Sequence, residues 1–326
     1  SHRLRIIRFL QFANYVIRNL GRRYHGDLII RDFFSTVFAP FDAKRKNIVV
    51  IHHLDISSVG FPSLYRWMTR RFFKRIRLAD EVVAVSQHWK NTIERAGCLN
   101  VTAVYNSFDL DKFEFDPDDL KRFEEKWGFD GPKPIIYLGN ARPEKGFLEA
   151  FEALRGIDAV FVATGRTEIP QGIRLLLLSY TDYLKLLRIC SLVLTMSKFE
   201  EGWCRTAHEA MLCGTPVIGS GKGGMEELLS GGQQIVCRDF SLLRSTVIGV
   251  LNDKEKMKRM SAAGQEFGRA HSFENFGRSW NDLVDRVVSS SGRKRVLHFT
   301  HANAPYGIGS FLLHLLRVHG RHRDID

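Results

Sequence analysis

The chain has 326 residues, of which 44% are hydrophobic and 26% charged, a length and composition that predict two packed domains and exclude an intrinsically disordered chain. No apolar run reaches the roughly 18 to 20 residues that are needed to span a bilayer. The 5 cysteines are odd in number and lack a closely spaced pair, which argues against a disulfide framework or a zinc site and for a reducing cytosol.

Positive charge is concentrated at the two ends of the chain. Residues 1–80 contain 16 Lys and Arg against 5 Asp and Glu, and residues 293–326 contain 6 against 2, whereas residues 81–292 contain 26 against 29. This distribution predicts an anionic partner for the part of the protein that the ends build. A membrane surface, a lipid-phosphate acceptor and nucleic acid are the alternatives, and no nucleic-acid-binding motif supports the last.

Short apolar runs alternate with longer amphipathic stretches along the body of the chain. The runs predict buried strands and the stretches predict helices, an alternation typical of α/β folds with parallel sheets. A charged segment over residues 111–133, which ends in Gly131-Pro132, predicts a linker and its flanking helix, so we expect a domain boundary near residue 131. The predicted strands cover residues 27–30, 47–51, 81–86, 101–105, 134–138, 159–164, 173–178, 192–197, 216–219 and 234–237.

His52 follows the second of these strands. The carboxyl ends of parallel strands border the ligand crevice of α/β folds, so His52 is a candidate site residue, with His53 as the alternative. Two adjacent histidines do not easily face one ion, and a metal site is not expected here.

Residues 64–77 combine basic and aromatic side chains in an amphipathic pattern. One interpretation is a helix that lies on an anionic membrane and presents lipid-linked acceptors. The other is an ordinary domain helix whose aromatic side chains fill the core while its basic side chains face water. The sequence leaves both open.

The most informative segment is EGWCRTAHEAMLCGTPV over residues 201–217. A tight turn leads from Glu201 into a short predicted helix over residues 204–213, which carries Glu209 and stops at Gly214. The N-terminus of such a helix offers N–H groups and a positive dipole to a phosphate. Two carboxylates that accept hydrogen bonds from hydroxyls, one on either side of a phosphate, suit a sugar nucleotide. The alternative is that Glu201 is a surface residue and Glu209 an unrelated helical residue.

This segment resembles the pattern E-G-F-G-x-x-x-x-E-A-M-x-x-G-x-P-V of glycosyltransferase family 4. Residues 135–146, 219–228, 79–86 and 104–109 also resemble segments of that family, in the family's order, so the resemblance covers most of residues 27–290. It implies a retaining enzyme of GT-B fold, in which two Rossmann-like domains with parallel sheets face an interdomain cleft and a nucleotide sugar is the donor.

The resemblance also implies roles for individual residues. Lys145 would bind the diphosphate, Glu201 the sugar hydroxyls, Glu209 the ribose, and His52 the donor sugar from the other domain. The predicted catalytic residues are therefore His52, Lys145 and Glu201, with no metal and no cofactor besides the nucleotide-diphosphate sugar as donor substrate. The predicted donor-binding residues are Asn140, Arg142, Arg166, Trp203, Cys204, Arg205, Glu209, Gly223, Gly224, Gly307 and Gly309.

Two positions depart from the family pattern. Asn140 stands where the family has an Arg, and an uncharged amide cannot neutralise a departing phosphate, so Arg142 is the candidate replacement. Cys204 replaces the second Gly, which restricts the turn but keeps the backbone N–H. Tyr180 lies in a region that resembles the base-contacting part of the family, with a role in the core as the alternative.

The ends of the chain depart further, because the start of the family's first domain has no counterpart in the amino-terminal part. Residues 295–301 predict a strand, and residues 305–313 predict a Gly turn that opens a helix, similar to the family's first strand and turn. One hypothesis is that residues 294–326 complete an otherwise incomplete amino-terminal sheet in circularly permuted order. The other is a truncated second copy. The predicted domains are residues 1–130 with 294–326, residues 131–272, and a crossing helix over residues 273–293.

The sequence thus predicts a retaining, metal-independent hexosyltransferase that moves a sugar to a hydroxyl of a glycan, a lipid-linked molecule or a small molecule. The expected location is the cytoplasm, at the inner face of the membrane. Two alternatives stay open. One is a catalytically weak protein on the same scaffold that binds a nucleotide sugar, an anionic surface or nucleic acid. The other is a nucleotide-sugar epimerase.

Overall fold

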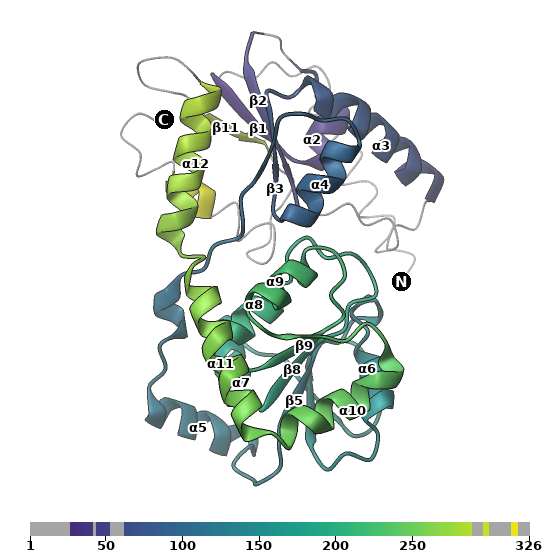
Figure 1. Cartoon of the computed structure of the whole chain (residues 1–326), viewed down its shortest axis with the longest axis vertical. Helices are drawn as coiled ribbons and strands as arrows, with labels where there is room; N and C mark the ends of the chain where they lie inside the picture. Colours follow the sequence, from purple (N-terminus) through teal and green to yellow (C-terminus); the bar gives the residue numbers. More distant parts are fainter. Residues whose placement is uncertain (1–26, 42–43, 53–61, 289–295, 300–313, 319–326) are drawn as a thin grey trace. The chain divides into compact units, whose positions relative to one another are not determined.

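The computed structural model describes residues 27–41, 44–52, 62–288, 296–299 and 314–318, which Figure 1 draws in colour. Contacts divide the chain into two compact units, Ser1–Tyr105 with Phe276–Asp326 and Asn106–Asn275. We call them the five-stranded unit and the six-stranded unit after their sheets. No helix of the described residues is long and apolar enough to cross a membrane.

The five-stranded unit is built on a parallel sheet with the strand order β11-β1-β2-β3-β4. Apolar side chains of its strands are packed against Phe72 and Trp89, which are buried on the helices that follow β2 and β3. The strands are β1 (Leu28–Arg31), β2 (Lys46–Ile51), β3 (Glu81–Ala84), β4 (Val101–Ala103) and β11 (Val296–Phe299), and the helices are α2 (Phe33–Phe38), α3 (Pro62–Arg75) and α4 (Gln87–Arg95).

Strand β11 comes from the carboxyl-terminal part of the chain and lies beside β1. The two strands pair in parallel, with Val296 opposite Leu28 and Phe299 opposite Arg31. The strand predicted within residues 295–301 is therefore confirmed, and it occupies the position that the permuted-order hypothesis requires. Gly307 and Gly309 lie outside the described residues.

The six-stranded unit has a parallel sheet in the order β10-β9-β8-β5-β6-β7. Its strands are β5 (Ile135–Asn140), β6 (Val160–Thr164), β7 (Ile173–Leu176), β8 (Leu192–Thr195), β9 (Val217–Gly219) and β10 (Ile235–Val236). Its helices are α5 (Pro117–Trp127), α6 (Phe147–Leu154), α7 (Tyr180–Ile189), α8 (Arg205–Leu212), α9 (Met225–Gly231), α10 (Phe240–Leu251) and α11 (Lys254–Arg269). All ten strands predicted within residues 27–237 are present, with ends displaced by a few residues.

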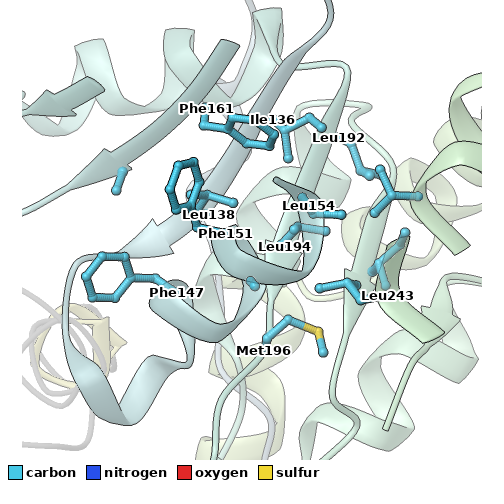
Figure 2. Packing of buried hydrophobic residues seen from close by; sticks show 14 of the residues in the cluster. Ile136, Leu138, Phe147, Phe151, Leu154, Phe161, Leu192, Leu194, Met196 and Leu243 are labelled. Atoms are coloured by element: carbon cyan, nitrogen blue, oxygen red, sulfur yellow. The ribbon is translucent and has the colours of Figure 1, made fainter. Parts of the chain in front are cut away.

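One face of the six-stranded sheet packs on α6 and α10 (Figure 2). Leu138 of β5 and Leu194 of β8 meet Phe151 and Leu154 of α6 and Leu243 of α10, all buried. Removing one such side chain from water stabilises the fold by roughly 1.5–3 kcal/mol. The cluster also includes Met196, just beyond β8, so the core reaches to the edge from which the loops of the candidate site leave the sheet.

The boundary between the units falls before Asn106, not near residue 131 as the sequence predicted. Helix α5, assigned to the linker, packs on α7, where Lys185 Nζ lies 2.6 Å from Asp119 Oδ2. The carbonyl of Trp127, the last residue of α5, accepts a hydrogen bond from Arg174 at 3.1 Å. The second boundary, before Phe276, lies within the first turn of α12 (Phe273–Val287), close to the predicted residue 273.

The five cysteines are free and buried, as small hydrophobic side chains are expected to be.

Candidate donor site at the carboxyl edge of the six-stranded sheet

The strand order of the six-stranded sheet reverses beside β5, because β6 pairs with one of its edges and β8 with the other. In open parallel sheets, ligands bind outside the carboxyl ends of the strands at such a point. The loops after β5, β8 and β9 therefore define the candidate site. They carry residues 140–146, 196–204 and 220–224.

The loop after β5 carries Lys145 in a short 3₁₀ turn that ends at Gly146. Gly146 has a φ of +69°, and a Cβ at this position would lie 2.2 Å from the carbonyl oxygen of Met196, so only glycine fits. The backbone N–H of Lys198 donates to the carbonyl of Glu144 at 2.9 Å. These contacts hold Lys145 close to the loop after β8.

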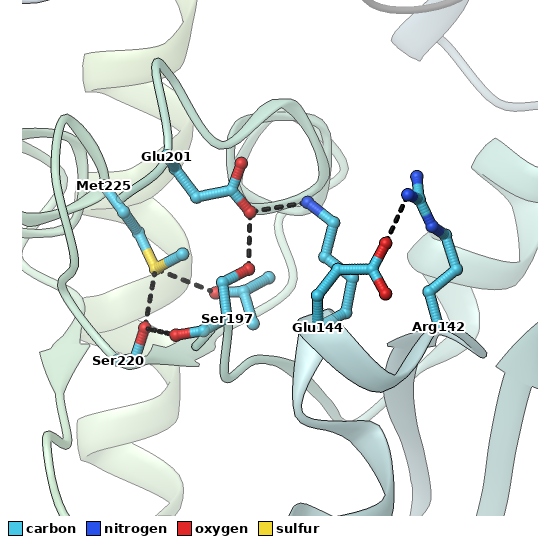
Figure 3. A network of polar contacts seen from close by, with 8 residues as sticks. Arg142, Glu144, Ser197, Glu201, Ser220 and Met225 are labelled. Carbon is cyan, nitrogen blue, oxygen red and sulfur yellow. Dashed lines mark hydrogen bonds and ion pairs between the residues drawn. The ribbon is translucent and has the colours of Figure 1, made fainter. Parts of the chain in front are cut away.

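Lys145 and Glu201, which are far apart in the sequence, form an ion pair. Lys145 Nζ lies 2.6 Å from Glu201 Oε1, and Ser197 Oγ donates to the same oxygen (Figure 3). The ammonium also lies 4.7 Å from the ring centroid of Phe199. The structure thus places a cation, which suits a phosphate, beside a carboxylate that can accept hydrogen bonds from sugar hydroxyls.

The glycine loop after β9 fixes the backbone of Glu201. The N–H of Gly224 donates to the Glu201 carbonyl at 2.9 Å, and the N–H of Glu201 donates to the Lys222 carbonyl at 3.2 Å. Gly223 has a φ of +68°, and a Cβ there would lie 2.4 Å from the Glu201 carbonyl oxygen. Gly223 and Gly224 therefore belong to the site through Glu201, as close backbone approach requires.

Helix α8 begins directly after the loop that follows β8 and carries Glu201. Cys204 is its N-cap residue and Gly214, with a φ of +76°, follows its end, so the predicted helix over residues 204–213 is confirmed to within one residue at each end. Burial, and next the charge of Glu201, raises the pKa of the Cys204 thiol to about 12. The thiol is protonated at neutral pH and is not a nucleophile.

Glu209 is buried on α8 beside two donors. Tyr180 donates to Glu209 Oε1 at 3.1 Å, and Arg205 Nη2 lies 3.3 Å from the same oxygen. Burial raises the pKa of the Glu209 carboxyl, and the charge of Arg205 opposes that rise. Tyr180, for which the sequence left a role in the site and a role in the core open, thus contacts a predicted donor-binding residue.

The Trp203 side chain packs inside the unit. Its Nε1 donates to His208 Nδ1 at 3.0 Å, and its ring lies 5.5 Å from that of His271. Because Nδ1 accepts this hydrogen bond, the proton of the neutral His208 ring is on Nε2, which donates to the Gly268 carbonyl at 3.2 Å. Burial lowers the pKa of His208 well below its usual value, so the ring is neutral. Only the backbone of Trp203 is left for a ligand.

Four further predicted site residues are either exposed or lie in the five-stranded unit. Arg142 forms an ion pair with Glu144 and is 59% exposed (Figure 3). Asn140 ends β5 and Arg166 follows β6, and both are exposed. His52 is half-buried directly after β2, in the five-stranded unit. Among the described residues, no three His, Cys, Asp or Glu side chains are grouped as metal ligands.

The sequence analysis missed Ser197, Ser220 and His208. Ser220 Oγ donates to the Ser197 carbonyl at 2.8 Å, which ties the end of β9 to the end of β8 (Figure 3). Ser197 ends the predicted strand over residues 192–197 and Ser220 directly follows the one over residues 216–219, positions that indicate the ligand edge of a parallel sheet. His208 gave no such signal, because its contact to the Gly268 carbonyl joins segments that are distant in the sequence.

Residues 119–267 match the protein family described as Glycosyl transferases group 1. The chain is 22% identical over 222 residues to an uncharacterized glycosyltransferase of Methanocaldococcus jannaschii, covering 63% of this chain and 59% of the relative. It is 26% identical over 246 residues to N-acetyl-alpha-D-glucosaminyl L-malate synthase of Bacillus anthracis, covering 68% and 63%. The chain thus spans about three fifths of the length of these two curated relatives.

The crystal structure of Anabaena HepE in complex with UDP-glucose is similar, with a TM-score of 0.69 and 20% identity over 80% of this chain and 79% of that chain. This likeness concerns the fold. The protein has the GT-B fold, and its residues 119–267 match the family Glycosyl transferases group 1.

Proposed function

We propose that this protein transfers a hexosyl group from a nucleotide-diphosphate sugar to a hydroxyl acceptor. The observation that carries the proposal is the Lys145–Glu201 ion pair at the switch point of the six-stranded sheet, with the Glu201 backbone held by Gly224 and Lys222. The family match and the likeness to a UDP-glucose complex support it.

In this proposal the diphosphate binds at Lys145 and the start of α8, where N–H groups and the helix dipole favour an anion. Glu201 accepts hydrogen bonds from sugar hydroxyls, and Glu209 accepts them from the ribose. Both carboxylates are buried, so the hydrogen bonds that a ligand makes there are shielded from competing water. His52 is a further proposed contact to the donor sugar.

The transfer breaks the bond between the anomeric carbon and the diphosphate oxygen, and the electron pair leaves with the diphosphate. The acceptor oxygen forms the new bond on the same face of the sugar, which retains the configuration, and its proton passes to the departing phosphate oxygen. Lys145 stabilises the negative charge that develops on the diphosphate. No protein nucleophile and no metal ion take part in this scheme.

A donor panel tests the proposal. UDP-, GDP- and ADP-sugars are incubated with the wild type, E201Q and E226Q, and nucleotide release and binding are both measured. Glu226 is an exposed glutamate on α9, the helix that follows the glycine loop, so E226Q is the matched control. We expect release from one donor by wild type and E226Q, and a loss of about 100-fold or more in E201Q.

The same assay tests the finer claims. Activity that persists in excess EDTA supports metal independence, and an NMR spectrum of the product shows whether the anomeric configuration is retained. Binding of no donor by the wild type, or equal release by E201Q and E226Q, would contradict the assignment of the site.

We also propose that α3 binds an anionic surface, because of its exposed face. Leu64, Arg66, Trp67, Arg70 and Lys74 are exposed along α3, and Pro62–Arg75 contains no acidic residue. A cationic face with exposed apolar side chains suits the interface of an anionic membrane, where lipid-linked acceptors reside. Co-sedimentation with anionic vesicles tests this proposal.

A further inference from the structure

Arg205, the first residue of α8, uses only part of its donor capacity. Its Nη2 lies 3.3 Å from Glu209 Oε1, while its Nη1 is buried and has no hydrogen-bond partner among the described residues. The guanidinium carbon lies 4.5 Å from the ring centroid of Phe108, and the side chain is 18% exposed. A buried charged donor without an acceptor is costly, so this side chain is arranged for an acceptor that a ligand supplies.

Its orientation is fixed from two sides. Phe108 supports the flat face of the guanidinium, and Phe108 is itself held by its backbone N–H, which donates to the His271 carbonyl at 3.1 Å. Glu209 holds one edge of the guanidinium. A cation held in this way keeps its donors in a fixed fork geometry, which suits recognition of phosphate oxygens.

Arg142, the predicted replacement for the Arg of the family pattern, is arranged differently from Arg205. Arg142 pairs with Glu144 and is 59% exposed, so its charge is compensated and screened by water. Asn140 is uncharged. Arg205 is half-buried, with its Nη1 atom fully buried, and is the first residue of α8, where the proposed function places the diphosphate.

We propose that Arg205 is a specificity-determining residue that binds the donor's diphosphate through Nη1 while Nη2 remains on Glu209. This inference rests on the proposed function, which places the diphosphate at the start of α8 and the ribose at Glu209. One guanidinium then contacts the phosphate directly and orients the carboxylate for the ribose. The site consequently distinguishes a nucleoside diphosphate from the corresponding nucleoside.

The simpler alternative is that Arg205 only neutralises and positions Glu209. The two roles differ in one measurable respect. Loss of a residue that acts solely through Glu209 and the ribose weakens binding of a nucleoside and its diphosphate equally, whereas loss of a residue that also binds the phosphate weakens diphosphate binding more.

The test uses the full chain and the nucleotide whose base the donor panel identifies. Dissociation constants of the nucleoside, the monophosphate and the diphosphate are measured at constant ionic strength for wild type, R205M, R205K and R244M. Arg244 is an exposed arginine on α10 that donates to the Arg155 carbonyl, so R244M controls for the loss of one cation. Thermal unfolding of each variant shows whether it is folded.

We expect R205M to weaken diphosphate binding by about 10- to 100-fold more than nucleoside binding, because only the diphosphate loses a charge-assisted hydrogen bond of its own. R205K, which keeps the charge without the fork, should fall between wild type and R205M, and provides the test if R205M does not fold. R244M should match wild type.

Equal losses of nucleoside and diphosphate affinity in R205M, or no loss at all, would overturn the phosphate role while the proposed function stands. If the wild type binds no nucleoside diphosphate, the proposed function fails first and this inference fails with it.

Discussion

Gly223 shows how one residue without a side chain sets the geometry of the site. Its φ is +68°, and a Cβ added at this position would lie 2.4 Å from the Glu201 carbonyl oxygen, so any other residue at position 223 would force the backbone to rearrange. The left-handed conformation alone costs an L-residue roughly 1–2 kcal/mol. We expect G223A to lower the midpoint of thermal unfolding and to weaken donor binding, because the backbone of Glu201 must move.

The chain provides a matched control in Gly249, inside α10, where an added Cβ meets nothing within 4 Å. G249A should stabilise the protein by roughly 0.5–1 kcal/mol, since alanine favours a helix interior. Equal unfolding midpoints and equal donor affinities for G223A and G249A would contradict the role assigned to the glycine loop.

At the scale of the element, α3 has one face in the core and one exposed face. Met68 and Phe72 are buried in the core, and Arg71 and Arg75 donate to backbone carbonyls at the end of α2, including that of Val37 at 2.8 Å. These residues follow the interpretation of an ordinary domain helix. Trp67, which is 49% exposed, and the basic residues beside it remain for a surface.

We therefore expect the protein to sediment with phosphatidylglycerol vesicles and not with phosphatidylcholine vesicles, and the R66E/R70E double variant to bind at least about 10-fold more weakly. Each basic residue near such a surface contributes about 1 kcal/mol, and the interaction is screened by salt. K254E/K258E on α11 makes the same change in net charge at exposed positions of the other unit. A similar loss in both double variants would show that net charge, and not the α3 face, governs binding.

At the scale of the whole molecule, residues from both ends of the chain build one sheet. β1 is buried between β2 and β11, and Leu28, Ile29 and Ile30 are almost fully buried. Deleting residues 294–326 turns β1 into an edge strand with unpaired backbone groups. We expect the backbone amides of residues 28–31 to lose protection from hydrogen exchange and the truncated protein to aggregate more readily.

Nucleotide binding is the internal control for this deletion, because Lys145, Glu201, Arg205 and Glu209 all lie in the six-stranded unit. We expect the truncated protein to retain it. Undiminished protection of β1 after the deletion would show that β11 contributes little to the sheet.

Short-range patterns in the sequence determined the positions of the strands and of α8. Apolar runs located the ten strands of the chain body, because a strand buried on both faces must be apolar over a few consecutive residues. Local chemistry also located α8, since a glycine that adopts positive φ ends a helix wherever it lies. The segment over residues 201–217 and its resemblance gave the fold and the family of residues 119–267.

The tertiary structure decided which partners these residues choose. Lys145 pairs with Glu201, His208 contacts the Gly268 carbonyl, and helix α5, within the linker segment predicted over residues 111–133, packs on α7. Each outcome depends on segments that meet only when strand order brings them together. Periodicity and spacing report the local backbone, whereas a buried polar side chain is assigned its partner by competition among groups that are distant in the sequence.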